Sequence, residues 1–184
     1  MGRYRQDYEQ DKPIEWQVLA IEKDKALVIS KYAMDCKPYN EMVEEITWEK
    51  CSLRAWLNAE FLNTAFADVE KGRIDVTKVP AHENPHSHVD VGNATEDRIF
   101  LLSIEEALNF ISEEERKCKP TKYIVTKGVL VYAENGCCRW WLRSPGNTRY
   151  QATCINDNGW QYYNIQVYST NVAVRPAMWI KLDS

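Results

Sequence analysis

The chain reads Arg139-Trp-Trp-Leu-Arg-Ser-Pro-Gly146 and, further on, Val174-Arg-Pro-Ala-Met-Trp-Ile180. Between these two apolar frames lies a segment, residues 147–171, that consists almost wholly of small polar and aromatic residues. It holds five Asn and four Tyr, and its only charges are Arg149 and Asp157, although 27% of the whole chain is charged. Tyr, Asn, Ser and Trp give large contact areas and adaptable hydrogen bonds at a low cost in side-chain entropy. The pattern therefore predicts a fixed frame that presents a binding surface within about residues 139–180.

Length and composition favour a single domain that covers residues 1–184, because 45% of the chain is hydrophobic and no linker or repeat interrupts it. The formal charge of -4 and the scattered basic residues argue against a nucleic-acid partner. No stretch approaches the roughly 20 apolar residues of a membrane span, and Met1–Gln6 lacks the apolar core of a signal peptide. We therefore expect no membrane insertion, and the localisation stays open.

Local patterns predict an α+β fold. Branched aliphatic residues at Ile14–Ala20 and Lys25–Ser30 indicate an N-terminal hairpin. Apolar residues at intervals of three and four predict a helix over about residues 49–63, and the capping box Ser103-Ile-Glu-Glu106 predicts the start of a second helix. The charged run Glu113–Lys117 is expected to end an exposed helix, and Arg98–Leu102 is a candidate buried strand.

Asn158-Gly159 is the strongest hairpin-turn signal in the chain. On the strand that follows, side chains alternate between two faces. Tyr163, Ile165 and Val167 share the face expected to point to the core. The opposite face is expected to meet a ligand and carries Tyr162, Asn164, Gln166 and Tyr168.

Candidate chemical sites are few. The three histidines, His82, His86 and His88, lie in a Pro- and Asn-rich loop and leave open a metal-binding accessory module, although a solvated loop is the favoured interpretation and we assign no metal. The six cysteines show neither C-x-x-C nor zinc-ribbon spacing, so free or buried thiols are expected. Arg139 beside Cys137 and Cys138 would lower their pKa values if its guanidinium lay close to the thiols.

The sequence contains no nucleophile elbow, no phosphate loop and no dinucleotide motif, so we expect no catalytic residue and no cofactor. Aromatic side chains offer a different function, since Trp faces pack on sugar rings. Trp140, Trp141 and Trp179 lie inside apolar frames and are expected in the core. Trp160, beside the turn, suits a place in the core and stacking on a ligand equally well.

An ordered set of motifs runs through nearly the whole chain. It comprises Gly2-Arg-Tyr-x-Gln6, Pro13-Ile-Glu-Trp-x-Val-Leu19, Trp48-x-x-Cys-Ser-Leu-Arg-x-Trp-Leu-Asn58, Phe100-Leu-Leu-Ser103, Trp140-Trp-Leu-Arg-Ser-Pro-Gly146 and Val174-Arg-Pro-Ala177. This set resembles a prokaryotic and phage family of domains of unknown function. That family looks related to the C-type-lectin fold branch, which includes formylglycine-generating enzymes and the variable proteins of diversity-generating retroelements. The resemblance implies a C-type-lectin-like fold, with two helices packed on short antiparallel strands and a loop-rich C-terminal half.

The two relatives imply different functions. Formylglycine-generating enzymes use a pair of cysteines near the C-terminus, and the final strand Val174–Met178 has no Cys where that pattern would place one. An oxidase or other enzyme built around Cys137, Cys138 and Cys154 is therefore the alternative, and we expect no enzyme.

Retroelement variable proteins resemble the chain better, because mutation of template adenines, often in AAC codons, fills their C-terminal surface with Asn, Tyr, Asp, Ser and Thr. The resemblance implies scaffold roles for Gln151, Gln161, Gln166 and Trp160, which AAC cannot yield by changes of adenine alone. The expected ligand-binding residues are Asn147, Thr148, Tyr150, Asn156, Asp157, Tyr162, Tyr163, Asn164, Tyr168, Ser169 and Asn171, with Trp160 included for its position beside the turn. Tyr163 is the least suited of these, since its strand phase points inward.

The expected function is ligand binding, as a receptor-binding or adhesion protein with a retroelement-diversified surface. The partner would be a protein or surface receptor, with a carbohydrate as a further possibility. The resemblance is compatible with a place on a virion or cell surface, reached through a partner. The sequence leaves the ligand and the oligomeric state open.

Overall fold

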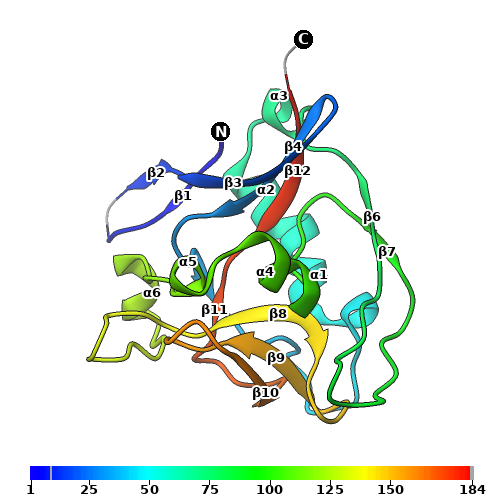
Figure 1. The fold of residues 1–184 in the computed structure, drawn as a ribbon. Helices are drawn as coiled ribbons and strands as arrows, with labels where there is room; N and C mark the ends of the chain where they lie inside the picture. The colour runs from blue at the N-terminus through cyan, green and yellow to red at the C-terminus, as the bar shows by residue number, and fades with distance from the viewer. Residues whose placement is uncertain (9, 183–184) are drawn as a thin grey trace.

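The computed structural model describes residues 1–8 and 10–182 and shows a mixed α+β fold (Figure 1). Within these residues the strands form one five-stranded, one three-stranded and two two-stranded sheets. The five-stranded sheet has the order β10 (Gln161–Gln166), β9 (Gln151–Ile155), β8 (Trp140–Pro145), β11 (Ala173–Val174) and β5 (Asp35–Cys36). The other sheets comprise β12 (Ala177–Lys181), β4 (Lys25–Ser30) and β3 (Trp16–Glu22); β1 (Arg3–Arg5) and β2 (Asp11–Pro13); and β6 (Thr77–Val79) and β7 (Thr95–Asp97).

The helices are short. They are η1 (Trp48–Lys50), α1 (Ser52–Trp56), the π-helical turn η2 (Leu57–Phe61), α2 (Leu62–Ala65), α3 (Asp68–Lys71), α4 (Ile104–Phe110), α5 (Glu113–Arg116) and α6 (Lys122–Thr126). In Figure 1, α1 and α4 lie between the three-stranded sheet above and the β8–β10 sheet below. The strands β1 and β12 lie at the end of the molecule opposite to β10.

Local signals predicted several of these elements. The N-terminal hairpin is confirmed as β3 and β4, which pair from Trp16↔Ser30 to Glu22↔Lys25. The first predicted helix corresponds to the nearly continuous helical stretch from η1 to α2, interrupted at Cys51. The second begins as predicted, because the Ser103 hydroxyl accepts from the Glu106 amide while the Glu106 carboxylate accepts from the Ser103 amide.

The structure corrects two expectations. The charged run Glu113–Lys117 does not end α4. Its first four residues form a separate helix, α5, because Ser112 provides a second capping box with Glu115. The segment Arg98–Leu102 is buried from residue 99 onward but makes only an isolated bridge between Phe100 and Ala177.

The side chain of Asn58 takes the place of a strand partner for the start of that segment. Its Oδ1 accepts from the Arg98 and Ile99 amides at 2.9 and 3.1 Å, and its Nδ2 donates to the Ile99 carbonyl at 2.8 Å. A side-chain amide therefore satisfies backbone groups that a ladder would otherwise pair.

The two apolar frames meet in the five-stranded sheet, where β11 pairs in parallel with β8 through Ala173↔Trp140. Trp140 and Trp141 are both fully buried, as expected, and their indole N–H groups donate to the carbonyls of Arg116 and Lys37, each at 2.9 Å. Trp179 packs against the core but is only half-buried, with the Lys25 ammonium 5.0 Å from its ring centre. The frame is thus a buried platform whose large side chains are hydrogen-bonded.

Candidate functional site

The segment between the frames forms the β9–β10 hairpin, as the Asn158-Gly159 signal predicts. The turn is closed by the Asn156 amide donating to the Trp160 carbonyl at 2.7 Å and by the Gly159 amide donating to the Asn156 carbonyl at 3.0 Å. Gly159 has a φ of +89°, and a Cβ there would lie 2.4 Å from the Glu113 carbonyl oxygen. A glycine is therefore required both by the backbone conformation and by the close approach of α5.

The alternation predicted for β10 is present. Ile165 and Val167 are buried, whereas Tyr162 and Asn164 are exposed. Tyr163 lies between these extremes, half-buried with its ring 4.9 Å from that of His86 in an edge-on contact. The register shifts between Tyr162 and Ile165, and β10 is an edge strand of its sheet. One side of this strand therefore faces the core while the other faces solvent.

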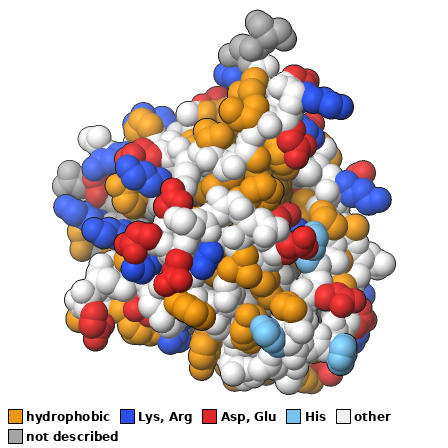
Figure 2. All heavy atoms as spheres, viewed as in Figure 1, with side chains coloured by type: hydrophobic (Ala, Val, Ile, Leu, Met, Phe, Trp, Pro, Cys, Tyr) orange, Lys and Arg blue, Asp and Glu red, His pale blue; other side chains and the backbone are white. Residues whose placement is uncertain are grey.

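The twelve residues expected to bind a ligand all lie at or near the surface. Eight are exposed: Asn147, Thr148, Tyr150, Trp160, Tyr162, Asn164, Tyr168 and Asn171. Four are half-buried: Asn156, Asp157, Tyr163 and Ser169. In Figure 2 the lower centre of the molecule, over β8–β10, carries few charged side chains, whereas basic and acidic groups are mixed at the left. We call these twelve residues the C-terminal face.

Contacts divide the C-terminal face into two parts. Near the β9–β10 turn, Arg139 places its guanidinium carbon 5.2 Å from the ring centres of both Tyr132 and Tyr162, and its Nε donates to Asn156 Oδ1 at 2.5 Å. Asp157 accepts from Asn135 Nδ2 through its carbonyl at 3.0 Å and through its carboxylate at 3.3 Å. These groups are tied to the body of the protein.

Three further members of the C-terminal face also have partners. The Trp160 indole donates to the Glu113 carboxylate at 3.1 Å, although the side chain is 59% exposed. Asn147 donates through its side-chain amide to Asn164 Oδ1 at 2.6 Å, and its backbone amide donates to the Tyr163 carbonyl at 3.0 Å. An amide pair thus links the β8–β9 connection to β10.

The remaining five members have no side-chain hydrogen bond to the described part of the chain: Thr148, Tyr150, Tyr168, Ser169 and Asn171. Their backbones, however, are held, since the Val167 amide donates to the Tyr150 carbonyl and the Leu130 amide donates to the Asn171 carbonyl. The side chains of these five residues are therefore left to solvent, while parts of their backbone are hydrogen-bonded. We call these five residues the free group.

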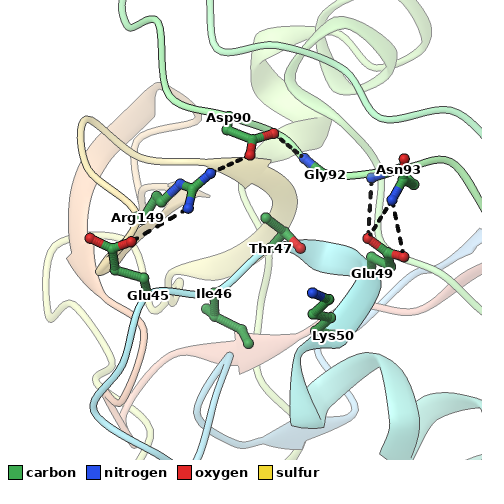
Figure 3. A pocket seen from close by; sticks show the side chains of 9 residues that line it. All are labelled: Glu45, Ile46, Thr47, Glu49, Lys50, Asp90, Gly92, Asn93 and Arg149. Carbon is green, nitrogen blue, oxygen red and sulfur yellow. Dashed lines mark hydrogen bonds and ion pairs between the residues drawn. The ribbon is translucent and has the colours of Figure 1, made fainter.

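A polar pocket of about 290 Å³ adjoins the free group at the β8–β9 connection (Figure 3). Its lining comprises Glu45, Ile46, Thr47, Glu49, Lys50, Asp90, Gly92, Asn93 and Arg149. Arg149 bridges two segments that are distant in sequence, since its guanidinium pairs with Asp90 and, at 3.4 Å, with Glu45. Its backbone carbonyl also accepts from the Ile46 amide at 3.1 Å. Arg149, the one cation of residues 147–171, therefore connects the β8–β9 connection to Glu45, Ile46 and Asp90.

The sequence predicted neither these contacts of Arg149 nor the role of Asn84, which holds the neighbouring loop in place. Asn84 is 1% exposed, and its Nδ2 donates to the carbonyls of Pro145 and Gly146 at 3.2 and 3.1 Å. The Ser87 hydroxyl donates to the same Gly146 carbonyl at 3.0 Å. These bonds fix the histidine-containing loop against the end of β8. An Asn before Pro85 was its only sequence signal.

The three histidines of this loop have different surroundings. His82 Nδ1 lies 2.8 Å from Glu105 Oε2, while His86 contacts Tyr163. The pale blue histidine side chains are separated from one another in Figure 2. Across residues 1–8 and 10–182, no group of three or more His, Cys, Asp or Glu is placed to hold a metal ion.

All six cysteines are free and buried, in agreement with the spacing. Burial raises the pKa of Cys36 to about 11 and that of Cys154 to about 12, and it also raises the pKa values of Cys137 and Cys138. The suggested lowering of the Cys137 and Cys138 pKa values is therefore wrong. The Arg139 guanidinium turns toward Asn156 and two tyrosine rings, and loss of solvent dominates at both thiols.

Comparison with known proteins gives one match. The sequence model of a family described as Domain of unknown function (DUF6273) matches residues 23–182. The searches of curated proteins and of solved structures found no match. In the described part of the chain, no helix has the length and apolar character needed to cross a membrane.

Proposed function

We propose that the chain, which belongs to the DUF6273 family of domains of unknown function, is a ligand-binding domain that uses its C-terminal face and performs no catalysis. One observation carries the proposal: four large aromatic side chains stand 41 to 59% exposed on and beside the β9–β10 hairpin, which pairs with the buried strand β8. They are Tyr150, Trp160, Tyr162 and Tyr168. Exposed aromatic groups on a rigid support are characteristic of binding surfaces.

The ligand we infer is a protein or carbohydrate displayed on a surface. The free group combines two phenol rings with hydroxyl and amide groups and contains no charge. Such a set suits hydrogen bonds and ring stacking with neutral polar partners. Only Asp157 among the twelve residues of the C-terminal face carries a charge, and it is bonded to Asn135.

We also propose a C-type-lectin-like arrangement for the fold. Its supports are the order of two helical regions followed by a strand-and-loop C-terminal half, and a final strand, β12, that returns to pair with β4 from Ala177↔Ile29 to Lys181↔Lys25. This is a likeness of architecture, which by itself does not transfer a function.

Diversification by a retroelement is a separable part of the proposal. The gene tests it directly: the codons of the expected variable positions should nearly all end in C, with a near-copy template and a reverse transcriptase close by. Scattered third bases and no template would remove this part and leave a binding domain of fixed sequence.

Binding through the C-terminal face is tested with a quadruple variant, Thr148→Ala, Tyr150→Ala, Tyr168→Ala and Asn171→Ala. Its matched control, Val69→Ala with Leu108→Ala, removes exposed apolar side chains elsewhere, at positions 83 and 43% exposed. Both proteins are applied to an array of immobilised carbohydrates and, in flow cytometry, to a panel of intact bacterial cells. The proposal expects binding by the wild type and the control, and its loss in the quadruple variant. Equal binding by all three proteins would contradict it.

A further inference from the structure

A second, larger concavity of about 840 Å³ lies apart from the free group. It is bounded by the start of β3, the residues after β4, the helix α5 and the segment that follows α5. Its lining comprises Trp16, Gln17, Lys31, Tyr32, Glu114, Glu115, Lys117, Lys119, Asn135, Cys137 and Arg175. We call it the basic groove, because four of these side chains are cationic and two are anionic, in a chain whose net charge is -4.

Arg175 lines the basic groove although the residue is only 2% exposed. Its guanidinium stacks on Trp140 with 5.0 Å between its central carbon and the ring centre, and its Nε donates to the Ser30 carbonyl at 2.7 Å. One terminal nitrogen donates to Gln17 Oε1 at 3.2 Å and the other to the Glu115 carbonyl at 3.4 Å. These partners are neutral and use three of the five N–H donors.

No carboxylate forms an ion pair with Arg175 in the described part of the chain. The nearest candidate, the Glu115 carboxylate, is engaged elsewhere, by the Ser112 hydroxyl at 2.5 Å and by Gln17 Nε2 at 3.1 Å. A buried charge is costly unless it is paired with a counter-charge. Arg175 thus keeps two N–H donors free of the bonds above and, although the Glu115 carboxylate is close enough to interact with its charge, has no direct ion pair among the residues described.

The rim of the basic groove adds a second available cation. Lys31 pairs with Glu15 at 2.8 Å, and Lys117 pairs with Glu114 at 2.5 Å. Lys119 is exposed and has no ion pair among the residues described. Trp16 and Tyr32, both half-buried, supply aromatic surface to the same concavity. Cationic groups and aromatic surface therefore face one space.

We propose that the basic groove binds a small organic anion, whose carboxylate or phosphate group is held by Arg175 and Lys119 and whose apolar part packs on Trp16 and Tyr32. The planar guanidinium fork suits bidentate recognition of either oxyanion. The ligand differs in charge from the neutral surface partner proposed for the C-terminal face. The two sites touch at one point, since Asn135 lines the groove and donates to Asp157.

The test is a titration of the isotope-labelled full chain, followed by NMR through the Arg175 Nε–H and Trp16 indole signals. The probes are phenyl phosphate, benzoate and, as a neutral control, benzyl alcohol. Saturable shifts with either anion, weakened by added salt and absent with the alcohol, are expected. A response to phenyl phosphate alone would assign a phosphate ligand, and a response to benzoate alone a carboxylate.

Charge variants make the test specific. Lys119→Glu should weaken anion binding by about tenfold or more, since one charged contact is replaced by repulsion. Lys78→Glu changes the net charge equally at an exposed position on β6 and should alter affinity less than about twofold. Arg175→Lys, which keeps the buried charge and removes the fork, should also weaken binding while the protein still unfolds cooperatively.

Absence of saturable shifts up to the solubility limit of both anions would overturn the proposal, as would equal affinities for the Lys119→Glu and Lys78→Glu proteins. The first result would identify Arg175 as a purely structural group, and the second would show that Lys119 does not hold the anion. The quadruple variant of the C-terminal face should bind the anion as the wild type does. Failure at the basic groove is therefore distinguishable from failure at the C-terminal face.

Discussion

The strands β8 and β10 belong to the same sheet, separated only by β9, and yet they relate to the rest of the molecule in opposite ways. Every residue of β8 from Trp140 to Ser144 is buried, and its polar side chains are bonded to distant segments. On β10, buried and exposed side chains alternate, and one strand edge is unpaired within its sheet. Position in the sheet, more than residue type, therefore decides which aromatic and polar side chains are fixed and which are exposed.

The largest effect is expected at Arg143 of β8. This residue is 3% exposed, and its guanidinium pairs with Glu106 through both terminal nitrogens and donates to the Leu101 carbonyl at 2.8 Å. Arg143→Ala removes the ion-pair partner of the half-buried Glu106 carboxylate and three hydrogen bonds of a buried guanidinium, and it should lower the free energy of unfolding by about 3 kcal/mol, measured by urea denaturation. Arg149→Ala, which removes an exposed pair, should cost less than about 1 kcal/mol. Similar costs for the two variants would mean that burial adds nothing to the strength of the Arg143 ion pair.

The same ion pair predicts a pH dependence. Burial by itself would raise the pKa of Glu106, but the hydrogen bonds and charge of Arg143 outweigh it and hold this pKa below the ordinary value of 4.5. A carboxylate whose pKa is lower in the folded than in the unfolded protein stabilises the fold at pH values above its unfolded-state pKa. This contribution is lost as the pH falls through the folded-state pKa. We expect thermal unfolding curves below about pH 4.5 to show this loss, and Glu106→Gln to flatten that part of the profile. An unchanged profile in the variant would contradict the prediction.

An intermediate effect is expected where the frame meets the hairpin. Arg139→Ala removes two ring contacts and the bond to Asn156, and it should cost about 2 kcal/mol in chemical denaturation. Tyr162→Phe is the matched control, because it keeps the ring beneath the guanidinium and should cost less than about 0.5 kcal/mol. A large loss of stability in Tyr162→Phe would mean that the hydroxyl, and not the ring, supports the turn.

The smallest effect on stability is expected in the free group. Tyr168→Ala and Thr148→Ala should each change the free energy of unfolding by no more than about 0.5 kcal/mol, because neither side chain has a hydrogen-bond partner among residues 1–8 and 10–182. Denaturation midpoints, read beside the binding assays, check this. A cost above about 1 kcal/mol would assign these side chains to the frame.

Local chemistry was predictable from the sequence. The Ser103–Glu106 capping box and the Asn158-Gly159 turn involve residues close together in the chain, and both appear in the structure. The free group was included among the expected ligand-binding residues because AAC codons yield its members by changes of adenine, and strand phase indicated exposure for Tyr168 alone. Family membership is shown by the match over residues 23–182.

Contacts between distant residues were not predictable. The side chain of Asn58 bonds to the backbone of residues 98–99 in place of a strand partner, and the Arg139 guanidinium packs on two tyrosine rings. The basic groove is lined by residues as far apart in the chain as Trp16 and Arg175. None of these pairings leaves a spacing or periodicity in a single sequence, because each depends on how the chain closes on itself. Composition therefore indicated a binding surface but could not separate its tied members from its free ones.

The position of β1 and β12, at the end of the molecule opposite to β10, has a consequence for affinity (Figure 1). Copies of the domain joined or anchored through that end would all direct the hairpin outward and could engage neighbouring targets together. Such avidity strengthens attachment by about 10²–10⁴ without any new contact. If the C-terminal face binds as proposed, each single contact in such an array can be weak while the array as a whole stays attached to a repetitive surface.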